Sequence, residues 1–425
     1  MMFYKETDFR ETPIGKIPRD WGIEKLGILC RFKRGFSYRS SQVTSNTTQI
    51  RFLTINDVEK EGGLKREAEK LYIKEGVEVD PEFFVNEGDV FIANTDMAKG
   101  FIIGAPLLMK NMDEKYVYSM DLTKLIFNKA KVDGIFLFYY LTHPSMRIRM
   151  KASAQGTNVL HLNHVIVSNF FIPLPPLQEQ QKIAEILLTV DKAIQKTNEI
   201  IAKTERLKKG LMQKLLTKGI GHEEFRDTEI GRIPREWEIV KLGDKKLAEI
   251  IMGQSPPSST YNREGKGLPF LQGKMEFGDI HPSPILYCSQ PIKIAEPNDI
   301  LISVRAPVGD VNIAPYRLCI GRGLAAIRFN LNRASHWFYF YYFQKIKNFL
   351  ENLGKGSTFK AITKEDLENL KVPYPSFFEQ QRIAEILFTI DKKLKIERDE
   401  KARLERIKQG LMDLLLTGKI RVKVD

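Results

Sequence analysis

The side chains best placed to do chemistry in this sequence are polar and basic, and they gather in short segments rich in turn residues. In the first half these segments are residues 31–42 (RFKRGFSYRSSQ), 94–100 (NTDMAKG) and 156–164 (GTNVLHLNH). In the second half they are residues 253–263 (GQSPPSSTYNR), 272–274, 305–310 (RAPVGD) and 354–360 (GKGSTFK). Glycine lets backbone amides approach a phosphate, and Ser, Thr, Asn, Gln, Arg and Lys offer hydrogen bonds to phosphates and base edges. The mixture suits a nucleic-acid groove, and it equally suits ordinary surface loops.

Within these segments, the candidates for DNA contact are the side chains that can bond a base edge or a phosphate. They are Arg34, Ser37, Arg39 and Gln42 in the first half, and Gln254, Ser255, Lys274, Arg305 and Lys355 in the second. Each of them alone is a common type of surface residue, so the prediction concerns the group.

The sequence contains none of the compact motifs typical of catalysis or metal binding. It has no GxxxxGK[ST] phosphate loop, no GxGxxG after a strand, no HExxH and no Asn-Pro-Pro-aromatic string. His161 and His164 stand three residues apart, but no carboxylate or cysteine stands near them in the sequence. We therefore predict no catalytic residue and no metal ligand. A binding role is the default, and a DNA-modifying enzyme with an unrecognised motif is one alternative.

The bulk composition favours a polyanionic partner. The chain has 425 residues and a formal net charge of +13. Its three cysteines, Cys30, Cys288 and Cys319, lie far apart, which argues against a disulfide framework and fits a reducing cytoplasm. No apolar run approaches the ~20 residues of a membrane span, so we expect a cytoplasmic protein without a membrane partner.

A tandem repeat dominates the sequence. Residues 9–27 (FRETPIGKIPRDWGIEKLG) recur as residues 225–243 (FRDTEIGRIPREWEIVKLG), with thirteen of nineteen positions identical. Residues 178–217 recur as residues 378–417 at an offset of 200. The interiors diverge, and only faint echoes survive in them. Two similar frames with different interiors indicate one scaffold that holds two recognition surfaces, whereas simple drift after a duplication is the alternative.

Three such echoes can be aligned between the two interiors. Residues 34–37 (RGFS) resemble residues 252–255 (MGQS), Phe138-Tyr139 resembles Phe338-Tyr339, and Gly156-Thr157 resembles Gly356-Ser357.

The second repeated segment predicts a long helix in each copy. Apolar residues follow a 4-3-4-3 spacing, and a stretch of ~40 residues would extend ~60 Å, so we expect the two helices to pack on each other as a coiled coil. The predicted seam comprises Ile183, Leu187, Val190, Ile194, Ile201, Leu211, Leu215, Ile383, Leu387, Ile390, Leu394, Leu404, Leu411 and Leu415. Ser376 begins a capping-box pattern before the second helix, whereas Pro176 stands at that position in the first copy. The polar seam positions Thr197, Glu397 and Lys401 either set the register or are solvated.

Each interior mixes strand-like and helix-like segments. Residues 50–55, 89–93, 117–127 and 299–304 are predicted strands. Residues 136–141 and 337–349 are predicted helices, and we assign their aromatic residues to the core because helical spacing indicates packing more often than base stacking. The predicted fold is thus α/β (α+β), with two globular modules in tandem, each followed by a long α-helix.

The chain resembles the specificity subunit of type I restriction-modification systems over nearly its full length. The residues that carry the resemblance are the IGKIPRDW and IGRIPREW segments, and the IPLPPLQEQQKIAEIL and VPYPSFFEQQRIAEIL segments that open the long helices. GQSPPSSTYN and DILISVRAPVGD in the second interior also resemble that family. In the first interior RGFSYRSSQ and NTDMAKG replace the more typical strings.

The resemblance implies a non-catalytic subunit with target recognition domains at 1–174 and 221–375, and spacer helices at 175–220 and 376–425. It implies that each domain reads one half of a split site in double-stranded DNA and that the helices fix the gap. It further implies two methyltransferase subunits and ATP-dependent restriction subunits as partners, which would bind S-adenosylmethionine, ATP and Mg, with no cofactor on this chain.

Physical reasoning agrees with this layout. Two modules on an antiparallel coiled coil would be related by a pseudo-two-fold axis and would meet half-sites about one helical turn apart. Because the modules differ, the site should be non-palindromic. The remaining alternative is a coiled-coil scaffold that binds proteins and not DNA.

Overall fold

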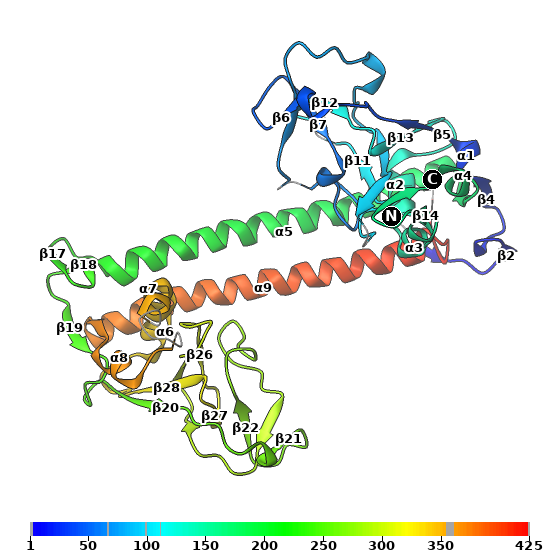
Figure 1. Cartoon of the computed structure of the whole chain (residues 1–425). Coiled ribbons are helices and arrows are strands. Elements are labelled where there is room, and N and C mark those ends of the chain that lie inside the picture. The colour runs from blue at the N-terminus through cyan, green and yellow to red at the C-terminus, as the bar shows by residue number, and fades with distance from the viewer. Residues whose placement is uncertain (1–2, 66–67, 98–99, 111, 354–360, 424–425) are drawn as a thin grey trace. The chain divides into compact units, whose positions relative to one another are not determined.

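The computed structural model describes residues 3–65, 68–97, 100–110, 112–353 and 361–423, so the predicted DNA contact Lys355 lies outside the described residues. The chain forms two compact units. Unit 1 comprises residues 1–197 and 400–425, and unit 2 comprises residues 198–399. Each unit therefore contains one globular module together with part of both long helices (Figure 1). Among the described residues, no helix has the length and apolarity that a membrane crossing requires.

Two four-stranded sheets form the centre of module 1, the globular part of unit 1. The first has the order β11-β9-β13-β5, and the second has the order β12-β7-β8-β6, in which β12 and β7 are parallel. The strands are β5 (Cys30–Arg34), β6 (Val43–Thr44), β7 (Ile50–Leu53), β8 (Leu71–Ile73), β9 (Val90–Ala93), β11 (Pro106–Leu108), β12 (Lys115–Tyr118) and β13 (Leu122–Phe127).

Module 2, the globular part of unit 2, has the same strand topology although its interior sequence differs. Its sheets have the orders β20-β28-β25-β26 and β21-β23-β22-β27-β24, and β22 and β27 are parallel. Only β24 at the sheet edge has no counterpart among the described strands of the corresponding sheet in module 1. The strands are β20 (Ala248–Met252), β21 (Tyr261–Asn262), β22 (Leu268–Leu271), β23 (Leu286–Cys288), β24 (Ile294–Ala295), β25 (Ile300–Ser303), β26 (Val311–Ile313), β27 (Leu318–Ile320) and β28 (Leu324–Phe329).

The repeated N-terminal segment of each copy forms a hairpin and an edge pair. The hairpins are β2 (Phe9–Thr12) with β3 (Gly15–Pro18), and β17 (Phe225–Thr228) with β18 (Gly231–Pro234). The edge pairs are β4 (Gly22–Lys25) with β16 (Phe171–Leu174), and β19 (Glu238–Lys241) with β29 (Lys371–Tyr374). Unit 1 also pairs the two ends of the described chain, because β1 (Phe3–Lys5) is antiparallel to β30 (Ile420–Val422).

Short elements complete both modules. A three-stranded sheet in module 1 has the order β10-β15-β14, with β10 (Thr95–Met97), β14 (Ala154–Gln155) and β15 (Val159–Leu162). The short helices are α1 (Leu26–Leu29), α2 (Gly134–Thr142), α3 (Pro144–Ala152), α4 (His164–Ser168), α6 (His336–Lys345), α7 (Lys347–Leu353) and α8 (Lys364–Asn369). The 3-10 turns are η1 (Ser40–Gln42), η2 (Ile55–Asp57), η3 (Pro81–Phe83) and η4 (Ser258–Thr260).

Most of the predicted short elements are confirmed. Strands occur within residues 50–55, 89–93 and 299–304, and the aromatic residues of α2 and α6 are largely buried in the core as predicted. The single strand predicted over residues 117–127 is wrong, because the chain turns at Ser119–Asp121 and supplies β12 to one sheet and β13 to the other. The helix predicted over 337–349 is likewise two helices, α6 and α7.

The structural alignment of α2 with α6 is shifted by two residues from the alignment that the sequence predicted. The Tyr139 hydroxyl donates to Asp191 at 2.5 Å, and the Tyr341 hydroxyl donates to Asp391 at 2.8 Å. Tyr139 therefore corresponds to Tyr341, and the predicted match of Tyr139 with Tyr339 is wrong.

The long helices are α5 (Leu177–Lys218) and α9 (Phe377–Leu415). The predicted cap of α9 is present, because the backbone N–H of Glu379 donates to Ser376 Oγ at 3.3 Å. The Glu379 carboxylate accepts from the Trp237 indole N–H at 3.0 Å. It is therefore engaged in tertiary contacts.

All fourteen predicted seam residues are buried or half-buried. At the helix ends the apolar face also packs into the module cores, which include Ile183 and Leu415 in unit 1 and Leu215 and Ile383 in unit 2. In the middle, polar positions are satisfied locally: the buried Thr197 hydroxyl donates to the Ala193 carbonyl at 3.0 Å.

Ion pairs join α5 and α9 within each unit. In unit 1 Lys408 pairs with Asp191 at 2.7 Å. In unit 2 Lys208 pairs with Asp391 at 2.6 Å, and Arg398 pairs with Glu205 at 2.9 Å.

Each unit also contains a buried cluster of a tryptophan, a glutamate and a basic side chain, which we call the Trp–Glu cluster. In unit 1 Glu179 accepts from the Trp21 indole at 3.2 Å and from Arg421 at 2.6 and 2.8 Å. In unit 2 Glu379 accepts from Trp237, as described above, and pairs with His222 at 2.9 Å. The repeated Trp and Glu thus attach each module to the long helices, which explains why these parts of the repeat are so similar.

Candidate DNA-recognition surfaces

Corresponding loops converge in each module, and the backbone joins them in the same way. In module 1 the Gly35 N–H donates to the Leu122 carbonyl at 3.1 Å. The equivalent Gly253 N–H of module 2 donates to Leu324 at 2.9 Å. We call residues 34–37, 94–96 and 118–122 loop cluster 1, and residues 252–255, 271–274, 304–305 and 320–324 loop cluster 2.

Further backbone bonds in these clusters also recur. Ser119 N–H donates to Leu53 and Gly321 N–H donates to Leu271, each at 2.8 Å. Similarly, Asn94 N–H donates to Asp121 at 2.7 Å and Val304 N–H donates to Gly323 at 3.0 Å. The two clusters therefore share a backbone frame while their side chains differ.

Glycine is required where the strands of this frame cross. A Cβ atom on Gly35 would lie 2.3 Å from the Ser119 carbonyl oxygen, and one on Gly253 would lie 2.2 Å from that of Gly321. These contacts with rigid backbone exclude any side chain. The resemblance between RGFS and MGQS is therefore structural, as the sequence alignment predicted.

Loop cluster 1 has a polar interior. The Asn94 side chain donates to the Met120 carbonyl at 3.1 Å and accepts from Thr123 at 2.6 Å, and its Oδ1 lies 2.7 Å from His164 Nε2. Burial and the nearby Arg34 guanidinium lower the pKa of His164. The exposed Arg34 donates through Nε to Met120 at 3.3 Å, so its position is fixed while part of its guanidinium faces solvent.

Loop cluster 2 has an apolar interior and an exposed polar rim. Val304 and Ala325 are buried where module 1 has Asn94 and Thr123. Gln254 and Arg305, two of the predicted DNA contacts, are exposed, and Arg305 lies in a backbone bridge with Ala361. Guanidinium and amide groups are the side chains that bind guanine and adenine edges in the major groove.

The structure gives some of the predicted DNA contacts a structural role. The Gln42 side chain accepts from the Arg39 backbone N–H at 2.8 Å and so caps a turn. Ser255 Oγ accepts from the Arg322 backbone N–H at 3.2 Å. Lys274 forms an ion pair with Asp310, which also pairs with Lys347. Ser37 and Arg39 are exposed on the connection after β5.

Arg322 is a candidate that sequence reasoning missed. It is exposed at the centre of loop cluster 2, and its position corresponds to Met120 in module 1. Among the described residues, no acidic side chain forms an ion pair with it. The available signal was its position between Gly321 and Gly323 directly after a strand-like segment.

The histidines His161 and His164 of module 1 lie beside loop cluster 1. His161 lies exposed in β15 opposite Thr95, whereas His164 bonds Asn94. Within the described residues, no group of three potential ligands of these types converges as a metal site would require.

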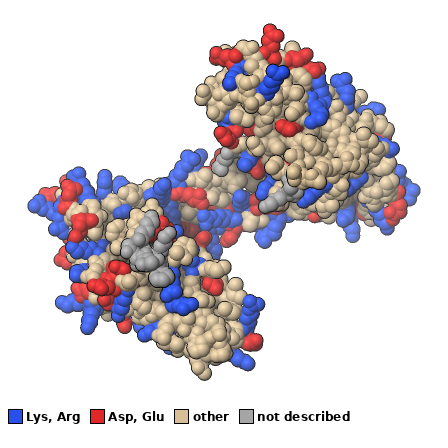
Figure 2. All heavy atoms as spheres, in the orientation of Figure 1, with Lys and Arg blue, Asp and Glu red and all other residues tan. Residues whose placement is uncertain are grey.

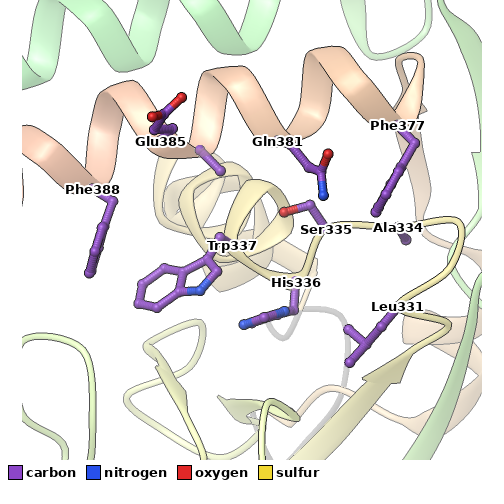
Figure 3. Close-up of a pocket in the computed structure, with 10 residues that line it drawn as sticks. Leu331, Ala334, Ser335, His336, Trp337, Phe377, Gln381, Glu385 and Phe388 are labelled. Atoms are coloured by element: carbon purple, nitrogen blue, oxygen red, sulfur yellow. The ribbon is translucent and has the colours of Figure 1, made fainter.

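A separate apolar pocket lies in unit 2 beside the start of α9 (Figure 3). Its volume is ≈ 380 Å³, and Leu331, Trp337, Phe377 and Phe388 contribute to its wall. His336 also lines it, and burial lowers the pKa of this histidine to about 4, so the imidazole is neutral at neutral pH. An apolar pocket with a neutral imidazole does not suit a phosphate, so we do not include it in the DNA surface.

Basic residues are not confined to the loop clusters. On the face drawn in Figure 2, Lys and Arg are spread over both units with Asp and Glu between them. The net positive charge supports association with a polyanion, whereas selection among sequences requires the exposed groups of the loop clusters.

Comparison with known proteins identifies this architecture. The family model described as the type I restriction modification DNA specificity domain matches residues 18–206 and again residues 234–406. A putative type I restriction enzyme specificity subunit, MjaX of Methanocaldococcus jannaschii, is 43% identical over 100% of this chain and 99% of its own length. The MjaVIII specificity subunit of the same organism is 29% identical over 100% of this chain and 98% of its own length.

Two solved structures have a similar fold. A chain from a study of complex assembly and conformational transition in the type I R-M system aligns with a TM-score of 0.57 and 31% identity, covering 95% of this chain and 99% of that one. The type I system S subunit from M. genitalium aligns with a TM-score of 0.62 over 96% of this chain and 97% of its own, and at 17% identity it supports the fold alone.

The chain therefore belongs to the family of type I restriction-modification specificity subunits. It carries two target recognition domains in tandem and acts as a non-catalytic, DNA-recognising subunit.

Proposed function

We propose that module 1 and module 2 each read one half of a bipartite, non-palindromic DNA site. The observation that supports this most directly is the shared backbone frame of the two loop clusters with different exposed side chains. A common frame would present both clusters to DNA in similar ways, and different side chains would select different bases. The recognition domains would comprise residues 1–174 and 221–375.

Each cluster offers its own set of DNA contacts. In module 1 we propose Arg34, Ser37 and Arg39. In module 2 we propose Gln254, Arg305 and the added Arg322. Gln42, Ser255 and Lys274 would act mainly by holding these loops, because their polar groups are engaged within the protein.

The long helices would form an antiparallel coiled coil that sets the gap between the half-sites, with spacer segments at 175–220 and 376–425. The ion pairs support this, because in unit 2 residue 205 pairs with 398 and residue 208 pairs with 391. The pair Asp191–Lys408 in unit 1 is the repeat equivalent of Asp391–Lys208 in unit 2. Such an exchange of roles is what a pseudo-two-fold relation between the copies would produce.

Two methyltransferase subunits would bind the outer faces of the helices, and restriction subunits would complete the complex. Leu207 and Ile407 support this, since they are equivalent residues of the repeat and are 55% and 40% exposed. Exposed apolar side chains that recur at equivalent positions suit two identical partners. S-adenosylmethionine, ATP and Mg would bind to these partner subunits, and the complex would act on DNA in the cytoplasm.

Mapping of modified adenines in cells that express this protein with its methyltransferase tests the proposal. We expect one two-part motif with an unspecified gap. Exchange of residues 225–375 for the corresponding segment of another specificity subunit should change one half of the motif only. The matched control is exchange of the first module, which should change the other half only. A change in both halves after either exchange would contradict modular reading.

A further inference from the structure

Unit 2 contains a groove that neither the loop clusters nor the contacts between the helices explain. Its volume is ≈ 950 Å³, and it is enclosed by the second half of α5, the first half of α9, and module 2 around β26 and α6. Seven basic and four acidic residues line it. The groove therefore carries a net positive charge.

The acidic residues of the groove are all engaged with basic side chains. Arg398 bonds both Glu205 and Asp279, at 2.9 and 3.1 Å. Asp391 pairs with Lys208, and Asp310 pairs with Lys347 at 2.6 Å. Four lysines remain, for which no carboxylate of the described residues lies within ion-pair distance: Lys209, Lys345, Lys392 and Lys395.

Aromatic rings orient two of these lysines. Lys392 Nζ lies 4.6 Å from the centre of the Phe388 ring, and Lys345 Nζ lies 5.7 Å from that of Tyr342. Lys345 is half-buried, and this burial lowers its pKa, so an anion beside it would offset the cost of its charge. Lys209 and Lys395 are exposed on α5 and α9.

The charge of the groove is repeated only in part in unit 1. The repeat places Gln409 and Gln195 at the positions of Lys209 and Lys395, whereas Lys192 stands at the position of Lys392. The correspondence of Tyr139 with Tyr341 places His143 at the position of Lys345, and His143 pairs with Asp413 at 2.9 Å. By contrast, the ion pair beneath the groove is present in both units, as Lys208–Asp391 and Lys408–Asp191.

This asymmetry bears on what occupies the groove. Two identical protein subunits that bind the two copies of the repeat would require similar linings in both units. A ligand that approaches only one module does not require this. The groove also adjoins loop cluster 2, because Asp310 in its lining bonds Lys274 of that cluster.

We propose that this groove binds phosphates of the DNA backbone next to the half-site that module 2 reads. The inference rests on the proposed function. Lys209 on α5 and Lys395 on α9 would each bind a phosphate. Lys345 would bind a phosphate from the side of the groove that module 2 forms. These contacts would add affinity without sequence preference, because the phosphates carry no direct base information.

The test uses the full chain in complex with its methyltransferase and a duplex that contains the mapped two-part motif. The variant is Lys209→Gln with Lys395→Gln. The matched control is Lys203→Gln with Lys393→Gln, because these exposed lysines lie on the same helices outside the groove. Loss of two phosphate contacts should make the slope of log K against log salt shallower by about 1.8. In the groove variant, interference by phosphate ethylation should disappear only at phosphates beside the second half-site. The preference for the mapped motif over a scrambled duplex should persist.

An unchanged slope in the groove variant, or an equal change in the control, would overturn the inference. Loss of methyltransferase assembly with an unchanged slope would assign the groove to a protein and also overturn it. Failure of the proposed function looks different, since the unaltered complex would then not distinguish the mapped motif from a scrambled duplex.

Discussion

Replacement of Arg421 by methionine should destabilise the part of unit 1 where β1, β30 and the start of α5 meet. The expected loss is about 3–5 kcal/mol, which is the usual cost of leaving one charge of a buried ion pair without its partner. Arg421 is 5% exposed and bonds Glu179, Asp20 and Glu6. Burial alone lowers its pKa, but the hydrogen bonds to Glu179 and Asp20 raise the pKa overall. Without Arg421, the Trp21 indole N–H would be the one remaining hydrogen-bond donor to the Glu179 carboxylate among the described residues.

Replacement of the partner carboxylate, Glu179→Gln, should reduce stability less, by about 1–3 kcal/mol. The reason is that Arg421 would still bond Asp20 and Glu6. The double variant should be more stable than the sum of the single effects predicts, since the charge of the buried Glu179 is removed together with the arginine that pairs with it. His222→Met in unit 2 is the matched comparison. It should also cost less than Arg421→Met, because Glu379 would still accept from Trp237 and from the Ile220 N–H at 2.9 Å.

Hydrogen exchange with mass spectrometry measures these effects where they occur. A loss of about 3 kcal/mol corresponds to exchange roughly 150-fold faster. Arg421→Met should produce this in β1, β30 and the first turns of α5, and His222→Met should leave those amides unchanged. Unchanged exchange in β1 and β30, or a double variant that shows the full sum of both single losses, would refute the reasoning.

The other predictions concern recognition, spacing and pH. Arg322→Ala should weaken binding to the cognate duplex by about 1–3 kcal/mol and relax preference only in the half read by module 2, and relaxation in both halves would be contradictory. Insertion of four residues after both Thr197 and Asp399 should lengthen the spacer by ~6 Å and the mapped gap by about two base pairs, with both halves unchanged. Because burial lowers the pKa of His336 to about 4 from 6.5, its contribution to stability should be complete above pH 6.5 and fall by about 3 kcal/mol as the pH drops through 4. In urea titrations at several pH values, His336→Gln should remove that part of the pH dependence, and an identical pH profile for both proteins would exclude this role.

The frame of this protein could be predicted from sequence because its constraints are local and repeated. Ser376 before an apolar-periodic run defines a helix start, and the long spacing pattern defines α5 and α9. The glycine in RGFS and in MGQS could be aligned across the copies because both sites exclude a Cβ atom.

The details of the loop clusters depend on long-range contacts, and for that reason they were not predictable. Lysine is a residue type that commonly binds phosphate, but Lys274 pairs with Asp310, which is distant in the sequence. Glutamine is a residue type that binds adenine, but the Gln42 side chain caps its own turn. The break at Ser119–Asp121 was also hidden, because apolar residues on both sides continue a strand-like pattern while the tertiary structure separates them into two sheets.

The division of the chain between the two units has a consequence for synthesis on the ribosome. Unit 1 requires residues 400–425, so module 1 cannot complete its contacts until these residues have been translated and Glu179 can meet Arg421 and β1 can meet β30. Unit 2 is contained in residues 198–399 and can complete its contacts earlier. The module made first would thus be the one finished last. A chain terminated near residue 400 would lose the integrity of the first recognition domain while the second remained whole.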